Sequence, residues 1–329
     1  MAEIILGGII LFIIAAITYV YRFRGQTRYS SFTQYLRKSW PLFAAPNCVL
    51  YMNTHQKARK PVLSSDDFAG LELLRSNWQL IRDEAQALQA SHTFDNARKE
   101  GAPSYYDVGF RTFFKYGWSK YYLTWYGYNH PSAARTCPQT VALLKQIPNV
   151  KGAMFSLLPA GSQLTIHSDP LACSLRYHLG LSTPNQTSCF IDVDGQRCHW
   201  QDGEDFVFDE TYPHFVRNDS DKPRLILMCD VKRPMYLPGR IFNFFYSMLG
   251  RMALVPNTEE DKRGAASALF ATISPLLARS KALKTTNRRL YKTLKYTTNT
   301  LLMLVVAGML LGVAEVFEWL LESQFTEEV

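Results

Sequence analysis

Acidic residues are missing from two long stretches of this 329-residue chain. Residues 4–65 contain eight lysines and arginines and no acid, and residues 279–295 contain seven such bases and again no acid. The net charge of +8 therefore belongs to the two flanks rather than to the middle of the chain. A basic flank can bind nucleic acid or an anionic membrane surface. Because an apolar run accompanies each flank, we predict an anionic membrane surface as a partner and no nucleic acid.

Cysteine is scarce, and its pattern is as informative as its number. The six cysteines form no C-x-x-C pair and lack the spacing of a disulfide framework. This absence argues against a structural zinc site and against a stapled secreted domain. We therefore expect reduced and mostly buried thiols. The chain also lacks internal repeats and low-complexity tracts.

A long apolar run near the N-terminus extends from Ile4 to Tyr21, about the length needed to cross a bilayer. A cleaved signal peptide is the alternative, but Glu3 precedes the run and no small-x-small cleavage site follows it. We predict an uncleaved membrane anchor over residues 1–24. The bases that follow place its C-terminal side in the cytoplasm. Residues 25–62 then form a basic juxtamembrane segment near the lipid headgroups.

The C-terminal part of the chain is first basic and then apolar. Residues 236–300 are predicted to form a basic amphipathic helical region, in which residues 241–252 are typical of an interfacial helix. A second apolar stretch covers residues 301–322 and is interrupted by Glu315 and Glu318. A run of this length can lie in the membrane interface or pack against protein, and a second membrane crossing is equally compatible with it.

Between these regions, residues 63–235 have the pattern of a folded domain. Residues 64–67 are typical of a helix start, and apolar residues recur at helical spacing from Leu71 to Leu88. Beyond residue 150, short apolar stretches end at Gly, Pro or Asn, which predicts strands at 153–158, 174–181, 189–193, 205–208 and 224–231. Asp194-Gly195 is a strong hairpin signal. The pattern predicts a β-sandwich or a jelly roll.

This domain contains a candidate metal site. His167 and Asp169 form an H-x-D pair, and His214 follows 45 residues after the aspartate. Because residues i and i+2 of a strand point the same way, the pair can offer two donors from one strand or its end. We expect His214 to approach from the opposite side. Two imidazoles and one carboxylate are the ligands of non-haem Fe(II) oxygenases, although a lone H-x-D pair also recurs by chance.

The amino-acid sequence around the H-x-D pair is more informative than the pair itself. Residues 161–170, 175–181, 200–204, 208–214, 224–227 and 230–231 form one ordered series. This series resembles the aspartyl/asparaginyl β-hydroxylase family of Fe(II)- and 2-oxoglutarate-dependent oxygenases. The chain looks most like the lipid A 2-hydroxylase branch, because Asn77-Trp78 and residues 113–115 with 117–118 also match. The resemblance implies a mainly β core, a double-stranded β-helix (jelly roll, cupin-like) with flanking helices, an N-terminal transmembrane helix and a C-terminal hydrophobic helix.

The resemblance also implies a set of iron ligands. His167 and His214 match the two iron histidines of the family. Asp169 matches the carboxylate of the lipid hydroxylase branch, where some protein-hydroxylating relatives carry glycine. The implied cofactors are Fe(II), the cosubstrate 2-oxoglutarate and O2, and residues 63–235 are accordingly predicted to be an oxygenase domain.

Four further residues match positions that bind the cosubstrate or lie near it. Arg224 matches the arginine that binds the far carboxylate of 2-oxoglutarate, a task for which a guanidinium fork is well suited. Ser156 matches a hydroxyl that assists it, and His178 matches a residue beside the near carboxylate. Arg176 matches a position near substrate or cosubstrate.

Together these matches imply an Fe(II)/2-oxoglutarate-dependent dioxygenase. Its expected reaction hydroxylates the 2-position of a fatty acyl chain on lipid A or its precursor, at the cytoplasmic face of the bacterial inner membrane. Another membrane lipid, such as an ornithine lipid, or protein Asp/Asn side chains are alternative substrates. An inactive membrane-bound binding module is the alternative of another class, but its expected signature, loss of a ligand or of Arg224, is not seen.

Overall fold

The computed structural model describes residues 2–107, 109, 114, 116–301, 304, 308, 312 and 315. These residues belong to two compact units, one formed by Val20–Ala271 and the other by Met1–Tyr19 with Thr272–Val329. The first unit contains both sheets and every candidate site residue. Most of the predicted apolar stretch 301–322 lies outside the described residues, as do Phe113 and Lys115.

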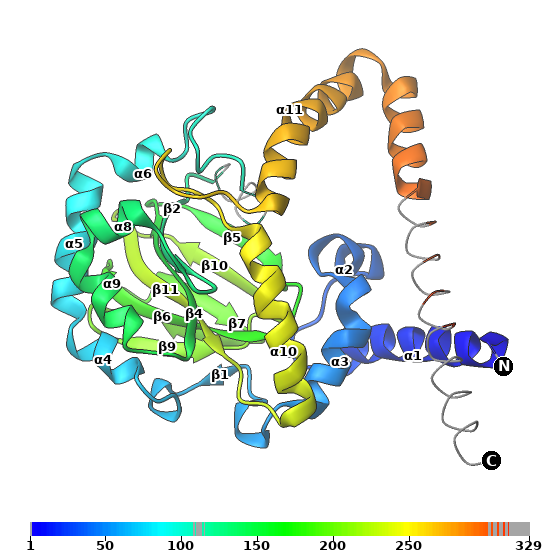
Figure 1. The fold of residues 1–329 in the computed structure, drawn as a ribbon, viewed down its shortest axis with the longest axis horizontal. Helices are drawn as coiled ribbons and strands as arrows, with labels where there is room; N and C mark the ends of the chain where they lie inside the picture. The colour runs from blue at the N-terminus through cyan, green and yellow to red at the C-terminus, as the bar shows by residue number, and fades with distance from the viewer. Residues whose placement is uncertain are drawn as a thin grey trace, which may run out of the picture. The chain divides into compact units, whose positions relative to one another are not determined.

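Two antiparallel sheets form the centre of the Val20–Ala271 unit (Figure 1). Within the described residues, the order is β1-β9-β6-β11-β4-β2-β3 in the larger sheet and β5-β10-β7-β8 in the smaller one. The strands are β1 (Val62–Leu63), β2 (Ser119–Trp125), β3 (Tyr128–Asn129), β4 (Val150–Leu158), β5 (Gln163–His167), β6 (Ser174–Ser182), β7 (Cys189–Val193), β8 (Gln196–His199), β9 (Asp205–Phe208), β10 (His214–Asn218) and β11 (Arg224–Lys232).

The pairing of β4 to β11 is nested. β4 pairs with β11, β5 with β10, β6 with β9 and β7 with β8. A long hairpin rolled up in this way, with its strands shared between two sheets, is a jelly roll. Asp194 and Gly195 both have positive φ, 54° and 85°, as a type I′ turn between β7 and β8 requires. The predicted jelly roll with flanking helices is confirmed.

The two faces of the larger sheet carry different side chains, because successive residues of a strand point to opposite faces. Odd-numbered residues of β4, β6 and β11, such as Phe155 and Leu227, belong to the larger apolar core. Even-numbered residues such as Met154 and Ile226 belong to a second cluster, which also contains residues of the smaller sheet. Four candidate site residues share this even numbering: Ser156, Arg176, His178 and Arg224.

Helices cover the odd-numbered face. They are α4 (Leu71–Ser76), α5 (Trp78–Ala90), α6 (Thr93–Asn96), α8 (Pro131–Thr136) and α9 (Pro138–Lys145). Figure 1 shows α4 and α5 along the left side of the sheets. The predicted apolar positions Leu71, Ile81 and Leu88 are buried in the core beneath them. The helix start expected at residues 64–67 is a short 3-10 helix, Ser65–Asp67. The stretch from Leu71 to Leu88 is divided into α4 and α5, because the chain leaves helical geometry at Asn77.

The remaining elements lie toward the two ends of the chain. They are α1 (Ala2–Arg22), α2 (Phe32–Lys38), α3 (Ala44–Asn53), α10 (Leu237–Gly250) and α11 (Ala265–Thr286), with 3-10 turns at Pro41–Phe43, Gln56–Ala58 and Arg251–Ala253. Among the described residues, one helix, Glu3–Arg22, is long and apolar enough to cross a bilayer. The six cysteines are free thiols, as expected.

Candidate metal centre and buried arginine

The two candidate histidines come from neighbouring strands. His167 ends β5 and His214 begins β10, and these residues face each other in the strand register. Their ring centroids lie 4.2 Å apart. Asp169 follows β5 by two residues, and one ligand atom from each of the three residues lies within 4.8 Å of the others. The expectation that His214 approaches from the opposite side is wrong, because β5 and β10 are adjacent in the smaller sheet.

Backbone carbonyls orient both rings. Nδ1 of His167 lies 3.0 Å from the carbonyl oxygen of Thr165, and Nδ1 of His214 lies 3.0 Å from that of Tyr212. A carbonyl can only accept, so each Nδ1 carries the proton and each Nε2 keeps its lone pair for a metal. Burial lowers the pKa of His167 to about 3 and that of His214 to about 4. Both rings are therefore neutral at pH 7, the form that binds metals.

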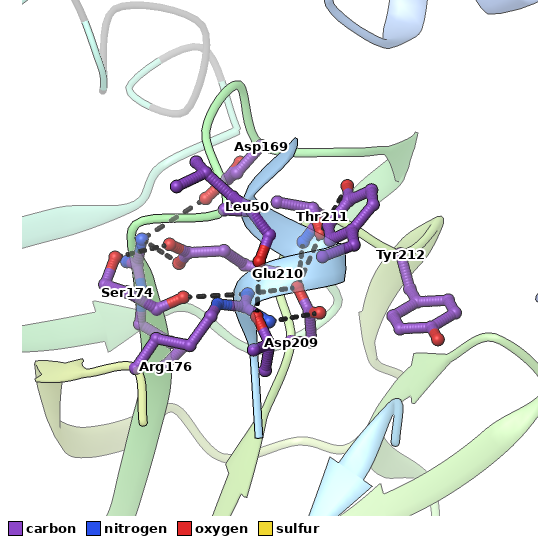
Figure 2. A network of polar contacts seen from close by, with 12 residues as sticks. Leu50, Asp169, Ser174, Arg176, Asp209, Glu210, Thr211 and Tyr212 are labelled. Atoms are coloured by element: carbon purple, nitrogen blue, oxygen red, sulfur yellow. Dashed lines mark hydrogen bonds and ion pairs between the residues drawn. The ribbon is translucent and has the colours of Figure 1, made fainter. Parts of the chain in front are cut away.

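Arg176 holds the candidate carboxylate ligand. Its Nη2 lies 3.2 Å from Oδ2 of Asp169, its Nε lies 3.1 Å from Oδ1 of Asp230, and it also pairs with Glu210. The backbone N–H of Asp169 donates to the Glu210 carbonyl at 2.8 Å. Figure 2 shows Arg176, Asp169 and Glu210 in this network. Burial raises the pKa of Glu210 to about 8, although Arg176 opposes the shift.

This arrangement refines the expectation for Arg176 and adds two residues. In the described structure its guanidinium pairs with three carboxyl groups, and its contact with Oδ2 orients Asp169. Sequence reasoning assigned no role to Glu210 or Asp230, although both lie in the quoted series, at 208–214 and 230–231. Strand parity could also have indicated Asp230, because it has the even numbering of the inner face of β11.

Arg224 is buried on the inner face of β11, where 0% of the residue is exposed. Its Nη2 donates to Oγ of Ser156 at 3.2 Å. Its guanidinium carbon lies 5.1 Å from the Trp118 ring and 4.5 Å from the Trp200 ring. Among the described residues no carboxylate pairs with it, and its Nε has no hydrogen-bond partner. Burial lowers its pKa to about 10, so the side chain remains a cation at pH 7.

His178 lies in the same inner layer. Nε1 of Trp200 donates to Nδ1 of His178 at 3.3 Å, so the proton of the imidazole is on Nε2. This buried Nε2 has no hydrogen-bond partner among the described residues. The Phe208 ring lies between His178 and His214, and its centroid is 5.0 Å from the ring centroid of His178 and 5.8 Å from that of His214. Burial, followed by the nearby Arg224 charge, lowers the pKa of His178 well below its usual value.

A buried cluster of ion pairs connects the segment that follows α1 to Asp209, which directly follows β9. Nη2 of Arg24 lies 2.9 Å from Oδ2 of Asp209, and Arg233 binds the same carboxylate at 2.8 Å. The Arg24 guanidinium lies between the rings of Tyr51 and Tyr212, at 4.0 and 3.6 Å. These two arginines hold the pKa of Asp209 below its usual range, against the effect of burial. Arg24 is therefore not exposed to headgroups, although it belongs to the acid-free stretch.

The same segment also contacts the loop between His167 and Asp169. Tyr29 shares a hydrogen bond of 2.7 Å between its hydroxyl and Oγ of Ser168, and the backbone N–H of Ser168 donates to the carbonyl of Lys38 at 3.0 Å. A small hollow lies between this segment and the loop, with Tyr29, Tyr35, Ser168 and Asp169 among its lining residues. Sequence reasoning missed these contacts, because nothing local marks Arg24 or Tyr29 as different from its basic and aromatic neighbours.

Comparison with known proteins gives one family match. Residues 75–234 match the model of the aspartyl/asparaginyl β-hydroxylase family, and this range includes all seven candidate residues. The chain is 37% identical to an ornithine lipid ester-linked acyl 2-hydroxylase from Rhizobium tropici over 128 residues, 39% of this chain and 46% of that protein. It is 32% identical to human aspartyl/asparaginyl β-hydroxylase over 170 residues, 50% of this chain and 21% of that protein.

The chain thus spans less than half the length of these two relatives. Among solved structures, a prolyl-4-hydroxylase from Pseudomonas putida aligns with 59% of this chain and 100% of its own, at 19% identity and a TM-score of 0.34.

Proposed function

Because residues 75–234 match the model of the aspartyl/asparaginyl β-hydroxylase family, we propose that this chain is an Fe(II)- and 2-oxoglutarate-dependent hydroxylase of a membrane lipid. The observation that carries the proposal is the combination of two features within one jelly roll. Three donors suited to Fe(II) converge at the start of β10, and a buried cation that has no carboxylate partner among the described residues lies on the inner face of β11.

The three donors fit the metal. His167 and His214 each present Nε2, and Asp169 presents a carboxylate oxygen, the two ligand types that a borderline divalent iron accepts. The fixed Nδ1–H bonds hold each ring in the required tautomer. When bound, Fe(II) together with 2-oxoglutarate and O2 supplies the oxidising power for C–H hydroxylation, with succinate and CO2 as the other products.

The side chains around Arg224 fit one end of a dicarboxylate. Arg224 would bind the far carboxylate, assisted by the hydroxyl of Ser156, because leaving this buried guanidinium unpaired is costly. The Nε2–H of His178 would donate to an oxygen of the near carboxylate. Trp118 and Trp200 exclude water from the guanidinium and so strengthen its attraction for an anion.

The proposed substrate is a lipid acyl chain, hydroxylated at its 2-position. Support comes from the apolar helix Glu3–Arg22, from the basic flanks and from the lipid hydroxylase relative. Lipid A or its precursor is the first substrate we propose, at the cytoplasmic face of the bacterial inner membrane, with residues 1–24 as the anchor. An ornithine lipid is the second, because the R. tropici relative carries that name.

The chemistry is tested with the purified full chain, Fe(II), 2-oxoglutarate and O2. We expect succinate to form slowly without substrate and faster with lipid, and we expect His214→Ala and Asp169→Ala each to abolish it. Succinate formation that persists in both variants, with circular dichroism showing native folding, would falsify the ligand assignment.

The substrate is tested by mass spectrometry of total lipids from cells with and without the chain. A gain of one oxygen on an acyl chain of lipid A supports the first proposal, and the same gain on ornithine lipid supports the second. Unchanged lipids together with hydroxylated Asp or Asn in cellular proteins would instead support the reaction named for the human relative.

A further inference from the structure

α10 is amphipathic in the reverse sense of an ordinary surface helix. Its inward side carries small and polar residues, Gly239, Asn243, Ser247 and Gly250, together with one aromatic residue, Tyr246, which packs against a small buried cluster. Its large apolar residues point outward and are between 39% and 66% exposed: Leu237, Ile241, Phe242, Phe244, Phe245, Met248 and Leu249. Surface helices of soluble domains turn the apolar stripe toward the core. An outward apolar stripe of this size marks an interaction surface.

The small residues fix this orientation. A Cβ added at Gly239 would lie 2.8 Å from Sδ of Met235, and one added at Gly250 would lie 3.0 Å from the ring of Tyr126. Nδ2 of Asn243 donates to the carbonyl of Cys173 at 2.8 Å, and Nε1 of Trp125 donates to the carbonyl of Gly250 at 2.9 Å. The polar side of α10 is therefore bound closely to the domain, and the helix cannot rotate its apolar side inward without losing these contacts.

α3 extends the same surface. α3 packs against α10 (Figure 1). The backbone N–H of Tyr236 donates to the carbonyl of Asn53 at 2.8 Å, and that of His55 donates to Pro234 at 3.0 Å. α3 exposes Val49 and Met52 by 41% and 61%. We call the exposed apolar residues of these two helices the α3–α10 face.

The charges near this face have one sign. α3 belongs to the acid-free stretch 4–65, and α10 belongs to a second one, 231–258. Exposed bases occur on both: Lys57, Arg59, Lys60, Lys232 and Arg240. Apolar side chains flanked by bases, without acids, are complementary to the interface of an anionic bilayer, where aromatic and aliphatic groups enter about 5–10 Å and bases meet phosphates. We propose that the α3–α10 face docks on an anionic lipid bilayer.

The chain itself offers a reason for this occupant. The apolar helix Glu3–Arg22 ends directly before this domain, where the Tyr21 ring lies 5.3 Å from that of Phe32 and 5.1 Å from that of Tyr35. A membrane-inserted α1 would therefore keep the domain at the bilayer surface, where an exposed apolar face is stabilised by lipid.

Docking would also orient the candidate metal centre. Asn47 of α3 brackets the loop after Asp169, with its Nδ2 donating to Pro170 and its Oδ1 accepting from the N–H of Ala172, both at 2.9 Å. Asn243 of α10 binds Cys173 in the same loop. The two helices of the docking face thus hold the loop that carries a candidate ligand. The inference rests on the membrane attachment in the proposed function but not on its chemistry.

Photocrosslinking of the full chain in phosphatidylethanolamine–phosphatidylglycerol proteoliposomes tests the face. Benzoylphenylalanine is placed singly at Phe245 on α10, at Leu11 on α1 as a lipid-facing control, and at the exposed Gln86 on α5 as a solvent control. Phe245 is 58% exposed, so this replacement leaves the fold intact. After irradiation, lipid adducts at 245 should exceed those at 86 at least about tenfold, since only an immersed group meets acyl chains.

Each other outcome overturns a defined part of the proposal. Adducts from 245 to the apolar residues 301–321 of the same chain, or to a second copy, would show that protein covers the face. Lipid adducts at 11 with none at 245 would reject the face and leave membrane attachment intact. Absence of lipid adducts at both positions would reject attachment itself. Because crosslinking needs no iron, none of these results depends on hydroxylase activity.

Discussion

The two faces of the larger sheet illustrate a division between stability and binding. On β11, the residues directed at the helices, such as Leu225 and Leu227, are apolar and fully packed. The alternate positions on the same strand include Arg224 and Asp230, which are equally buried but charged. Both sets lie in the protein interior, so burial alone does not distinguish them. The residues directed at the helices, which form the outer face, are stabilised by packing alone. Arg224 on the inner face instead has a buried Nε that finds no hydrogen-bond partner among the described residues.

This difference predicts how each face responds to substitution. Apolar side chains on the outer face contribute to the free energy of unfolding and should not affect ligands. An unpaired buried charge reduces stability and is retained where a ligand uses it. The inner face should therefore tolerate apolar replacements that would abolish binding, and the outer face should do the reverse.

The largest effect on stability is expected from the outer face. Leu227→Ala should lower the free energy of unfolding by about 2–5 kcal/mol, because it leaves a cavity in a closely packed core. Urea denaturation measures the loss, and calorimetric titration with Mn²⁺ in place of Fe²⁺ measures metal affinity below the unfolding transition. We expect unchanged affinity. A loss of metal affinity in the folded variant would break the separation of the two faces.

On the inner face the expected effect is on binding. Arg224→Met should lower the affinity for 2-oxoglutarate by about 100-fold or more, because a charge-assisted pair is lost. Its free energy of unfolding without ligand should be unchanged or higher, because an unpaired buried cation is removed. Arg224→Lys is the matched control: it keeps the charge and loses the fork, and its affinity should fall between the two. If Arg224→Met binds 2-oxoglutarate with wild-type affinity, Arg224 does not bind the far carboxylate.

The alternation that separates the two faces was readable in the sequence. The predicted strands 189–193 and 205–208 coincide with β7 and β9, since each is short, apolar and bounded by turn residues. β5 and β10 were missed, although each contributes a candidate ligand. β5 reads Gln-Leu-Thr-Ile-His and is partly exposed, so its composition resembles that of a loop. β2 was missed because its buried Lys120 interrupts an otherwise apolar pattern.

The candidate site shows the same limit: local sequence patterns revealed some of its residues but not the contacts that the fold creates. The three metal donors were recognisable because they lie in an ordered, family-like series, and the structure brings them together. The ion pairs of Arg176 with Glu210 and Asp230 were not, although both acids lie in that series, because only the fold decides which side chains meet. Arg24 and Tyr29 form hydrogen bonds with Asp209 and Ser168, each more than 130 residues away. Contacts at that separation are fixed by the fold and leave no local pattern.

Substitution of Arg24 tests whether the segment that follows α1 helps to hold the metal ligands. Arg24→Met should lower the free energy of unfolding by about 1–3 kcal/mol, because Asp209 loses one of its two charged donors and two rings lose a cation. Metal affinity should fall about tenfold, as for other groups that orient ligands indirectly. Arg28→Met is the control in the same segment, because Arg28 is exposed and binds only nearby carbonyls. Equal effects of the two substitutions would place Arg24 outside the site.

The smallest expected effect concerns a single hydroxyl. Tyr29→Phe keeps the buried ring and removes the bond to Ser168, whose backbone lies between two candidate ligands, His167 and Asp169. The free energy of unfolding should fall by about 1 kcal/mol. If the hydroxyl positions the loop, affinity for Mn²⁺ should also fall several-fold, whereas a purely structural role would change stability alone. Tyr19→Phe on the exposed surface of α1 should change neither quantity. If Tyr29→Phe lowers the free energy of unfolding but leaves the affinity for Mn²⁺ unchanged, the segment that follows α1 does not position the metal ligands. The strands alone would then hold the candidate site.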